Sequence, residues 1–383
     1  MDFVCAKSDL VFGVKLASCA LGTRSSMPIL AGLKMEITGS HLSLQATDLE
    51  RAVRCEIPIE NKGGDEAAVL NGAILYQIAS HLPADDKITF RTDAASGTTV
   101  ALRCGEASFD LPTLPVEDYP EIAALPASKI ATINVSDFHH GLEHTAFAAL
   151  KAGETTRMSL TGVDLVLKGN QLRMVATNGY RLAVKTIDVT ECQEEGEYLI
   201  EASVLTDLDR VLAQVDSPTL DIRRGEGQLF FHAGAVTFMA RTIGEEFPDF
   251  ERVIPRDNPI ALTFERRALL EALQRIQITA AEDSGAITIL AGTDETAVRI
   301  RSSSKDKGEA EERVRLKKAP TKPVEISFRA EYVIDVLKRL ASDTVTIWLA
   351  DGRKAGLIEP AADPIAPADQ GFLYVCMPVL LSS

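Results

Sequence analysis

The sequence is short of positive charge for a protein that would hold nucleic acid over its whole surface. Its 383 residues contain 40 Lys and Arg against 55 Asp and Glu, which gives a formal net charge of −15. Nonspecific binding to phosphates needs clustered Lys and Arg, so this balance argues against a protein that coats nucleic acid. It does not exclude a local basic face on an acidic body.

Cysteine pairs and long apolar runs are also missing. The six cysteines include no Cys-x-x-Cys pair, which argues against a zinc ribbon or a disulfide framework and favours reduced, mostly buried thiols. No run reaches the roughly 18 apolar residues of a membrane span. Residues 1–7 are acidic from Asp2 on and hold no apolar signal segment. We therefore expect a soluble, cytoplasmic protein with no membrane partner.

Length and composition predict several folded domains. The chain exceeds the roughly 250–300 residues at which a single hydrophobic core stops growing, so two or three domains are expected. With 46% hydrophobic residues the chain can collapse, which argues against intrinsic disorder.

Two kinds of helical pattern recur along the chain at a nearly constant spacing. The first kind centres on Leu10, Phe138 and Leu269, at steps of 128 and 131 residues. The second kind centres on Leu75, Leu205 and Val333, at steps of 130 and 128 residues. Ser8 and Ser136, two positions before an apolar residue, are predicted N-caps. Two independent markers at one spacing predict three repeats, against the alternative of an ordinary α+β chain with similar helices.

Short alternating runs between these helices are typical of strands. They lie at residues 42–46, 165–167, 172–175 and 345–349. Many short strands with two helices per repeat predict an α+β fold of antiparallel sheets with helices on one face. Proline-bearing junctions at 114–120 and 246–255 place the domains at 1–125, 126–254 and 255–383. The polar run 302–309 is predicted to be a mobile loop.

One short motif suggests enzyme chemistry. Gly-x-Gly-x-x-Gly, the P-loop and Gly-x-Ser-x-Gly are absent, which argues against a phosphate cradle and a nucleophile elbow. Residues 140–144 read His-Gly-Leu-Glu-His, in which His140 and His144 would bind zinc and Glu143 would act as general base. The equivalent stretch 12–16 of the first repeat has no such residues. We predict no catalytic site, no metal and no cofactor, and keep a zinc hydrolase as a third, unfavoured alternative.

Five short segments together resemble one family of replication proteins. They read Met-Pro-Ile-Leu at 27–30, Gln-Ala-Thr-Asp-Leu-Glu at 45–50, Val-Ala-Thr-Asn-Gly-Tyr-Arg-Leu-Ala at 175–183, Phe-Pro-Asp-Phe-Glu-Arg-Val-Ile-Pro at 247–255 and Tyr-Val-Cys-Met-Pro-Val at 374–379. In this order and spacing, the chain resembles the β sliding clamp of bacterial replicative DNA polymerase III over essentially its whole length.

The resemblance implies a topological function. It implies the DNA clamp fold with three repeated clamp domains, and a head-to-tail homodimer that closes six domains into a ring with antiparallel sheets outside and helices lining the hole. Such a ring would encircle duplex DNA without reading its sequence, and would tether replicative and repair polymerases for processivity. Its partners would be duplex DNA, and DNA polymerases and the clamp loader through linear peptide motifs.

The resemblance also implies two sets of functional residues. A hydrophobic cleft for partner peptides would comprise Leu160, Thr177, Gly179, Tyr180, Arg181, Leu182, Pro248, Arg252, Val253, Tyr332, Val375, Met377, Pro378 and Val379. The DNA-facing residues would be Arg24, Lys151, Arg157, Arg210, Arg275, Lys338 and Arg339. Apolar area and an adaptable Met suit varied peptides. Core packing is the alternative for Leu182 and Val253, and a solvated surface is the alternative for each charge.

The C-terminus and the expected inner face depart from the family pattern. The chain ends Met-Pro-Val-Leu-Leu-Ser-Ser (377–383), where the family commonly ends Met-Pro-Met-Arg-Leu, and Ala73, Ile74, Ala202 and Ser203 stand where many relatives carry basic residues. This weak basic lining keeps a second hypothesis open, a clamp-like peptide-binding scaffold that encloses DNA poorly. The sequence does not decide between a main replicative clamp and a divergent second copy.

Overall fold

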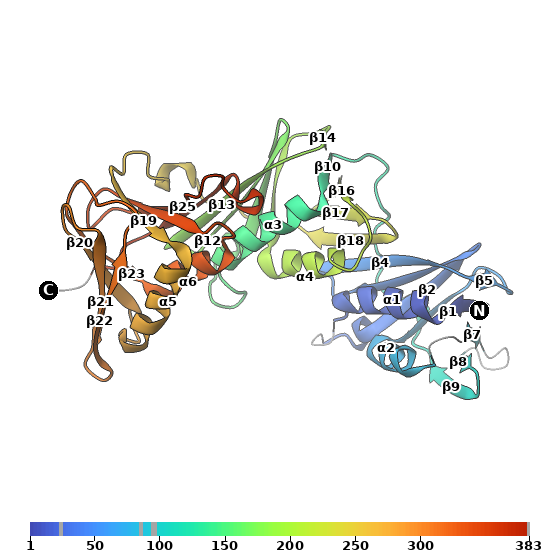
Figure 1. The fold of residues 1–383 in the computed structure, drawn as a ribbon. Helices are drawn as coiled ribbons and strands as arrows, with labels where there is room; N and C mark the ends of the chain where they lie inside the picture. The colour runs from blue at the N-terminus through green and yellow to red at the C-terminus, as the bar shows by residue number, and fades with distance from the viewer. Residues whose placement is uncertain (23–25, 84–86, 93–97, 381–383) are drawn as a thin grey trace. The chain divides into compact units, whose positions relative to one another are not determined.

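The computed structural model describes residues 1–22, 26–83, 87–92 and 98–380, drawn from blue to red in Figure 1. Within these residues the chain divides into two compact units. The N-terminal unit comprises Met1–Val135 and Thr206–Thr242, and the C-terminal unit comprises Ser136–Leu205 and Ile243–Ser383. Each unit is described by itself below.

Two antiparallel sheets form the N-terminal unit. The first has the order β5 (Glu60–Asn61), β1 (Asp2–Ala6), β7 (Lys87–Thr92), β8 (Thr99–Cys104) and β9 (Ala107–Pro112). The second contains, in order, β10 (Ala131–Asn134), β16 (Thr219–Gly225), β17 (Gln228–Ala233), β18 (Val236–Arg241), β4 (Arg51–Pro58), β3 (His41–Thr47), β2 (Gly32–Thr38) and β6 (Ala67–Asn71). Pairing of β4 with β18 joins the first and second repeats in one sheet.

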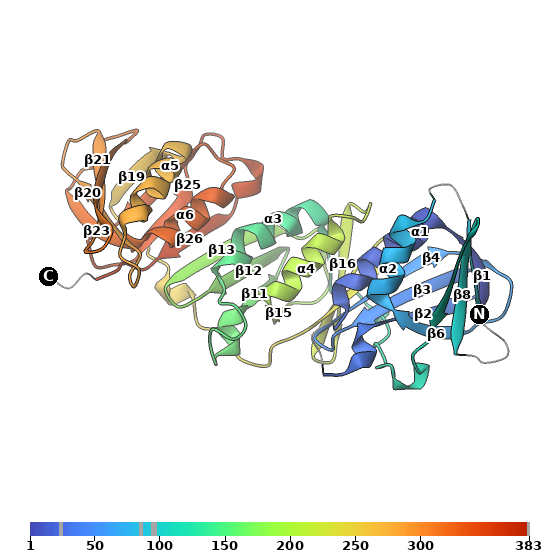
Figure 2. The same cartoon turned by 90° about the horizontal axis from the view of Figure 1, so that it is seen from below.

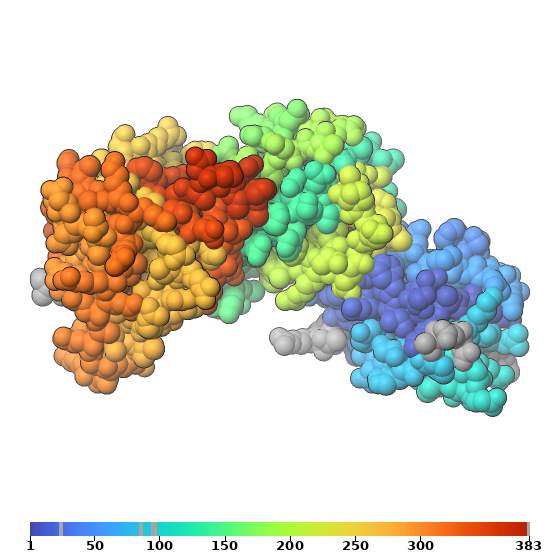
Figure 3. All heavy atoms as spheres, in the orientation of Figure 1, coloured from blue at the N-terminus to red at the C-terminus, as the bar shows by residue number. Residues whose placement is uncertain are grey.

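The C-terminal unit repeats this arrangement. One sheet has the order β15 (Gly196–Glu201), β11 (Gly162–Lys168), β12 (Gln171–Thr177), β13 (Arg181–Asp188), β26 (Phe372–Cys376), β25 (Gly356–Pro360), β24 (Thr344–Leu349) and β19 (Ile260–Glu265). The other has the order β22 (Gly308–Arg315), β21 (Ala297–Ser304), β20 (Ala286–Ala291) and β23 (Val324–Arg329). The two-residue strand β14 (Glu191–Cys192) lies in the chain between β13 and β15. Pairing of β13 with β26 joins the second and third repeats, and Figure 3 shows the red C-terminal segment against the green central one.

All six predicted helices are present at the predicted spacing. The first kind comprises α1 (Lys7–Ala17), α3 (Val135–Thr145) and α5 (Arg266–Ile276), and the second kind comprises α2 (Gly72–His81), α4 (Ala202–Leu212) and α6 (Ala330–Arg339). Figure 2 shows α1 beside α2, and α5 beside α6, each pair packed on a sheet. The prediction of three repeated α+β domains with mostly antiparallel sheets is confirmed.

Small residues let the first helix of a repeat approach its sheet. A Cβ atom on Gly13 would lie 2.5 Å from Leu44 Cδ1, and one on Gly141 would lie 2.2 Å from Met174 Sδ. Real Cβ atoms do not approach so closely, so a side chain at either position would force the end of Leu44 or Met174, or the helix itself, to shift. The shared small residue at this repeat position therefore sets the helix-to-sheet distance.

The predicted N-caps are wrong. α1 begins at Lys7, directly after the extended residue Ala6, and α3 begins at Val135, so Ser8 and Ser136 lie inside the first helical turn. Each helix follows directly on a strand, and the turn therefore occurs at the last strand residue rather than at the nearest serine. Side-chain caps occur elsewhere, for example at Asn71, whose Oδ1 accepts from the Ile74 N–H at 3.0 Å.

Two further predictions have opposite outcomes. The polar run 302–309 is not a loop, because Ser302, Ser303 and Ser304 pair with β22 and only residues 305–307 form the turn. Ser302 lies on the buried face of this strand and Ser303 on the exposed face, so polarity alone was a poor guide to the structure of this segment. The prediction of free thiols is confirmed, and four of the six cysteines are buried.

Candidate functional site

An apolar pocket of about 230 Å³ opens on the central repeat of the C-terminal unit. It is lined by Arg157, Leu160, Thr177, Gly179, Tyr180, Arg181, Leu182, Pro248, Asp249, Phe250, Val253, Val375 and Met377. Ten of the fourteen predicted cleft residues are in this set. The structure thus brings together residues from four stretches of the chain, at 157–160, 177–182, 248–253 and 375–377.

The pocket floor is a buried apolar stripe across neighbouring strands. Val175 of β12, Leu182 and Val184 of β13, and Val375 of β26 form one core cluster, on which the partly buried Phe250 packs. Side chains alternate along a strand, so Met174, next to Val175, faces the other side of the sheet, where it contacts α3. The pocket therefore opens on the sheet face opposite the helix.

A tight turn between β12 and β13 forms one wall. Thr177 Oγ1 donates to the Arg181 carbonyl at 2.6 Å, and the Asn178 carboxamide oxygen accepts from the N–H groups of Tyr180 and Arg181 at 2.9 and 3.0 Å. Gly179 has φ +88°, a left-handed conformation that favours glycine. The turn exposes 66% of the Tyr180 side chain at the mouth of the pocket.

Arg181 is held by the protein itself. Its Nη1 donates to Asp335 at 2.7 Å and its Nη2 to the Phe147 carbonyl at 2.5 Å. The guanidinium also lies 4.7 Å from the centre of the Tyr332 ring. With these partners Arg181 fixes the pocket wall to α6, so its role is to position the wall.

Four predicted cleft residues do not line the pocket. Tyr332 lies behind the turn, where its hydroxyl accepts from Asn178 Nδ2 at 3.2 Å. Arg252 is exposed and paired with Asp249 at 2.7 Å. Pro378 and Val379 lie beyond Met377, and the Val379 N–H donates to the Ser327 carbonyl at 2.8 Å, which leads the chain away. Residues 381–383 of the unusual C-terminus lie outside the described residues.

Three lining residues were missed by the sequence reasoning. Phe250 and Asp249 lie inside the 247–255 motif, between two residues that were chosen, so a closer reading of that motif could have found them. Arg157 was assigned to DNA, yet it lines the pocket three residues before Leu160. Only the path of the chain through the short helix η5 (Met158–Thr161) brings it there.

A buried carboxyl group lies beside the pocket floor. Asp164 of β11 is opposite Val175 in the sheet and is 1% exposed. Burial, together with the nearby Glu197 carboxylate, raises the pKa of Asp164 to about 7. The floor therefore borders a group that carries a proton at slightly acidic pH.

Two of the predicted DNA-facing arginines are paired with carboxylates. Arg210 on α4 lies 2.7 Å from Asp207, and Arg275 on α5 makes two hydrogen bonds with Glu312, at 2.6 and 3.0 Å. Both guanidinium groups are exposed, so these pairs are worth little to stability. A phosphate would have to compete with the carboxylate at each position.

The other predicted DNA-facing residues differ in exposure. Lys151 and Lys338 are exposed. Arg339 is half-buried, with its guanidinium 4.3 Å from the centre of the Phe147 ring. Arg24 lies outside the described residues. The structure therefore leaves few fully solvated cations among those predicted.

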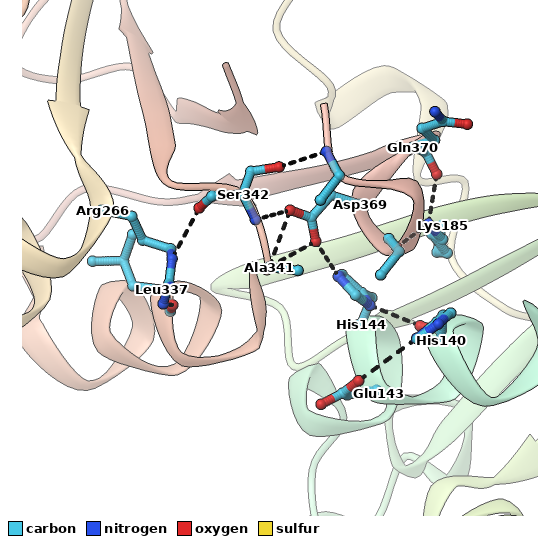
Figure 4. A network of polar contacts seen from close by, with 12 residues as sticks. His140, Glu143, His144, Lys185, Arg266, Leu337, Ala341, Ser342, Asp369 and Gln370 are labelled. Carbon is cyan, nitrogen blue, oxygen red and sulfur yellow. Dashed lines mark hydrogen bonds and ion pairs between the residues drawn. The ribbon is translucent and has the colours of Figure 1, made fainter. Parts of the chain in front are cut away.

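The His-x-x-Glu-His motif does not assemble as a zinc-peptidase site. His144 is buried, with Nε2 2.9 Å from Asp369 Oδ1 and Nδ1 2.8 Å from the His140 carbonyl, so both ring nitrogens are occupied (Figure 4). Asp369 also accepts from the N–H groups of Ala341 and Ser342. Burial alone would raise the pKa of Asp369, but these hydrogen bonds hold it well below its usual range.

Lys185 completes this polar network. Its side chain is buried, and Nζ donates to the carbonyls of Ala368 and Gln370 at 2.6 and 2.5 Å. Burial lowers the pKa of Lys185 to about 8, although Asp369 opposes the shift. The His144 ring thus lies between two oxygen acceptors, the Asp369 carboxylate and the His140 carbonyl.

Comparisons with known proteins agree across the whole chain. Residues 1–123, 132–249 and 251–379 match the N-terminal, central and C-terminal domain models of the DNA polymerase III beta subunit. The beta sliding clamps of Pseudomonas aeruginosa and Escherichia coli are each 27% identical, over 100% of both chains. The crystal structure of the DNA polymerase III subunit beta from Pseudomonas aeruginosa superposes with a TM-score of 0.91 at 27% identity, again over 100% of both chains. Among the described helices, none is both long and apolar enough to cross a membrane.

Proposed function

The chain belongs to the DNA polymerase III beta subunit family, and we propose that it acts as a sliding clamp, a homodimeric ring that encircles duplex DNA and tethers polymerases. In this proposal the chain is an accessory subunit with no catalytic role of its own, and it acts in the cytoplasm. The domain boundaries at residues 125 and 254 remain a prediction; the family models match residues 1–123, 132–249 and 251–379.

The observation that carries the ring is the pairing pattern of the repeats. β4 follows the turn at residues 47–51 and β13 follows the equivalent turn at 177–181. Each of these strands pairs with the last strand of the next repeat, β4 with β18 and β13 with β26. The corresponding strands β22 and β9 end their sheets among the described strands. A chain with complementary free edges at its two ends suits head-to-tail association, and closure into a ring removes both edges. The number of copies, two, follows from the family.

An exposed apolar side chain near one of these edges supports the same association. Ile278, on a short helix that packs against β22, is 68% exposed. A lone monomer gains nothing from apolar groups in water, whereas an interface between two copies would bury them.

The solution mass of the full chain tests the ring. At micromolar concentration we expect sedimentation equilibrium to give the mass of two chains, and Ile278→Asp to give one, because a buried carboxylate would oppose association. Val253→Asp is the matched control, since Val253 is an exposed apolar residue of the pocket. A wild-type monomer, or a dimer that tolerates Ile278→Asp, would contradict the proposed interface.

The pocket is proposed as the cleft for linear peptide motifs of polymerases and the clamp loader. Its apolar floor, exposed Tyr180 and flexible Met377 offer area that varied peptides can use. A fluorescent peptide with a polymerase tail motif should bind at least tenfold more weakly to Met377→Asn and Leu182→Asn, from the loss of apolar contact. Ile278→Asp serves as the control that keeps the pocket. Unchanged affinity in both pocket variants would refute the assignment.

The second candidate, a scaffold that encloses DNA poorly, rests on the paired and half-buried state of Arg210, Arg275 and Arg339. Direct contacts with phosphates are expected to be few and sensitive to salt, so DNA would be held mainly by enclosure in the ring. Of the predicted DNA-facing set, Lys151, Arg157 and Lys338 are exposed.

A further inference from the structure

The helix α3 carries a group of possible metal ligands that differs from the sequence motif. His144 is turned inward to Asp369, whereas His139, His140 and Glu143 each place a ligand atom within 4.8 Å of the others. Figure 4 labels two members of this cluster, His140 and Glu143, beside the buried network that contains His144 and Asp369.

Helical spacing explains why these three side chains meet. His139 and Glu143 are four residues apart, and His140 and Glu143 are three apart, so all lie over one stretch of the helix surface. Glu143 Oε2 is 4.0 Å from His139 Nε2 and 3.9 Å from His140 Nδ1. Ligands on a tetrahedral ion with bonds of about 2.0–2.1 Å lie roughly 3.4 Å apart, so small side-chain rotations would suffice.

The state of His140 is a second observation that favours a ligand. Its Nδ1 atom is buried and has no hydrogen-bond partner among the described residues. Buried polar atoms are nearly always satisfied, by protein, water or an ion.

Neighbouring charges limit the affinity. Lys185 acts on His140, and Arg339 acts on Glu143, both as positive charges that oppose a bound cation. The site itself supplies one carboxylate. With two positive charges nearby and one carboxylate ligand, we expect a dissociation constant in the micromolar range, weaker than that of a structural zinc site.

We propose that His139, His140 and Glu143 bind a divalent transition metal ion of the zinc or nickel type on α3, with water at the open position. Two imidazoles and one carboxylate suit such ions better than magnesium or calcium, which prefer oxygen ligands. The site is independent of the clamp function, and no catalysis is assigned to it.

Titration of the tag-free full chain with Ni²⁺ by calorimetry tests the site, because nickel selects imidazole over the free thiols. We expect one Ni²⁺ per chain, and at least tenfold weaker binding for His139→Ala and for Glu143→Gln. Both side chains are nearly half exposed, so these variants should fold, and thermal unfolding would verify it. His41→Ala, an exposed histidine elsewhere, is the control and should bind as the wild type does.

Two results would overturn the proposal. One is the absence of binding at 1 mM Ni²⁺, which is about a thousandfold above the expected micromolar constant. The other is binding that persists unchanged in both ligand variants, because the ion would then lie on other groups.

Discussion

The two junctions between repeats, one in each unit, share a backbone pattern but differ in chemistry. In the N-terminal unit, Leu16 of α1 and Cys55 of β4 are fully buried, and Cys55 is opposite Val236 of β18. In the C-terminal unit the equivalent positions hold His144 of α3 and Lys185 of β13. The first junction is therefore apolar, and the second is ionic.

The difference shows that one scaffold accepts two kinds of core. The apolar junction is stabilised by the burial of apolar surface, and this contribution does not depend on pH or on the orientation of the contacting groups. The ionic junction depends on hydrogen bonds that link α3, the segment near Asp369 and the residues after α6. A buried ion pair adds little net stability over an apolar filling, but loss of one partner is costly. We therefore expect the C-terminal unit to be more sensitive to single charge changes.

The largest effect is expected from Asp369→Asn, which breaks the ionic junction. It should lower the free energy of unfolding by about 3–5 kcal/mol, because the buried Lys185 loses its nearby carboxylate and the His144 ring loses its partner. Urea unfolding followed by fluorescence of Trp348, the single tryptophan, reports on this unit. Asp351→Asn, at an exposed turn, is the control. A loss below about 1 kcal/mol would mean that the pair is not the element that holds the junction.

The pH dependence of Lys185 gives the next effect. Its pKa is lowered from 10.5 to about 8, so between these values the unfolded chain holds a proton that the folded chain lacks. Stability then rises with pH in this window, and the wild type should gain roughly 3 kcal/mol relative to Lys185→Met between pH 8 and 10.5. Unfolding at several pH values measures the difference. Lys338→Met, on the surface, should show no such trend.

Both junctions contain an Arg–Asp ion pair, and we expect its removal to cost a similar free energy of unfolding in each unit. Arg51 pairs with Asp207, and Arg181 pairs with Asp335, at equivalent repeat positions. Asp207→Asn and Asp335→Asn should each cost about 1.5–3 kcal/mol, the range for a hydrogen bond to a charged group. Hydrogen exchange of β4 and β13 would detect the local loosening. A loss in only one unit would contradict the equivalence of the two pairs.

The smallest effect concerns the turn that precedes β4 and β13. Leu49 has φ +79° where the second repeat has Gly179 at +88°, and both turns share their side-chain hydrogen bonds. Gly179→Ala should cost about 1 kcal/mol from backbone strain alone, since a Cβ there meets no atom within 4 Å. The turn should persist, as it does around Leu49. A cost above roughly 3 kcal/mol would imply a steric clash instead.

The sequence predicted the elements that depend on local pattern. The six helices followed from the repeat spacing, and ten of the fourteen cleft residues that the family resemblance implied line the pocket. The ionic junction was not predicted, because His144, Lys185 and Asp369 lie far apart in the chain and meet only through pairing of β13 with β26. The position of Arg157 at the pocket was not predicted either, because the lining residues 248–253 lie almost 100 residues away in the chain.

The most direct test of the clamp function is retention on nicked circular DNA. After loading with a cognate clamp loader and ATP, we expect the protein to stay on circles at salt concentrations that remove proteins held only by charge. Cutting the circle should release it, because a ring slides off a free end. Retention after linearisation, or no retention on circles, would contradict the account.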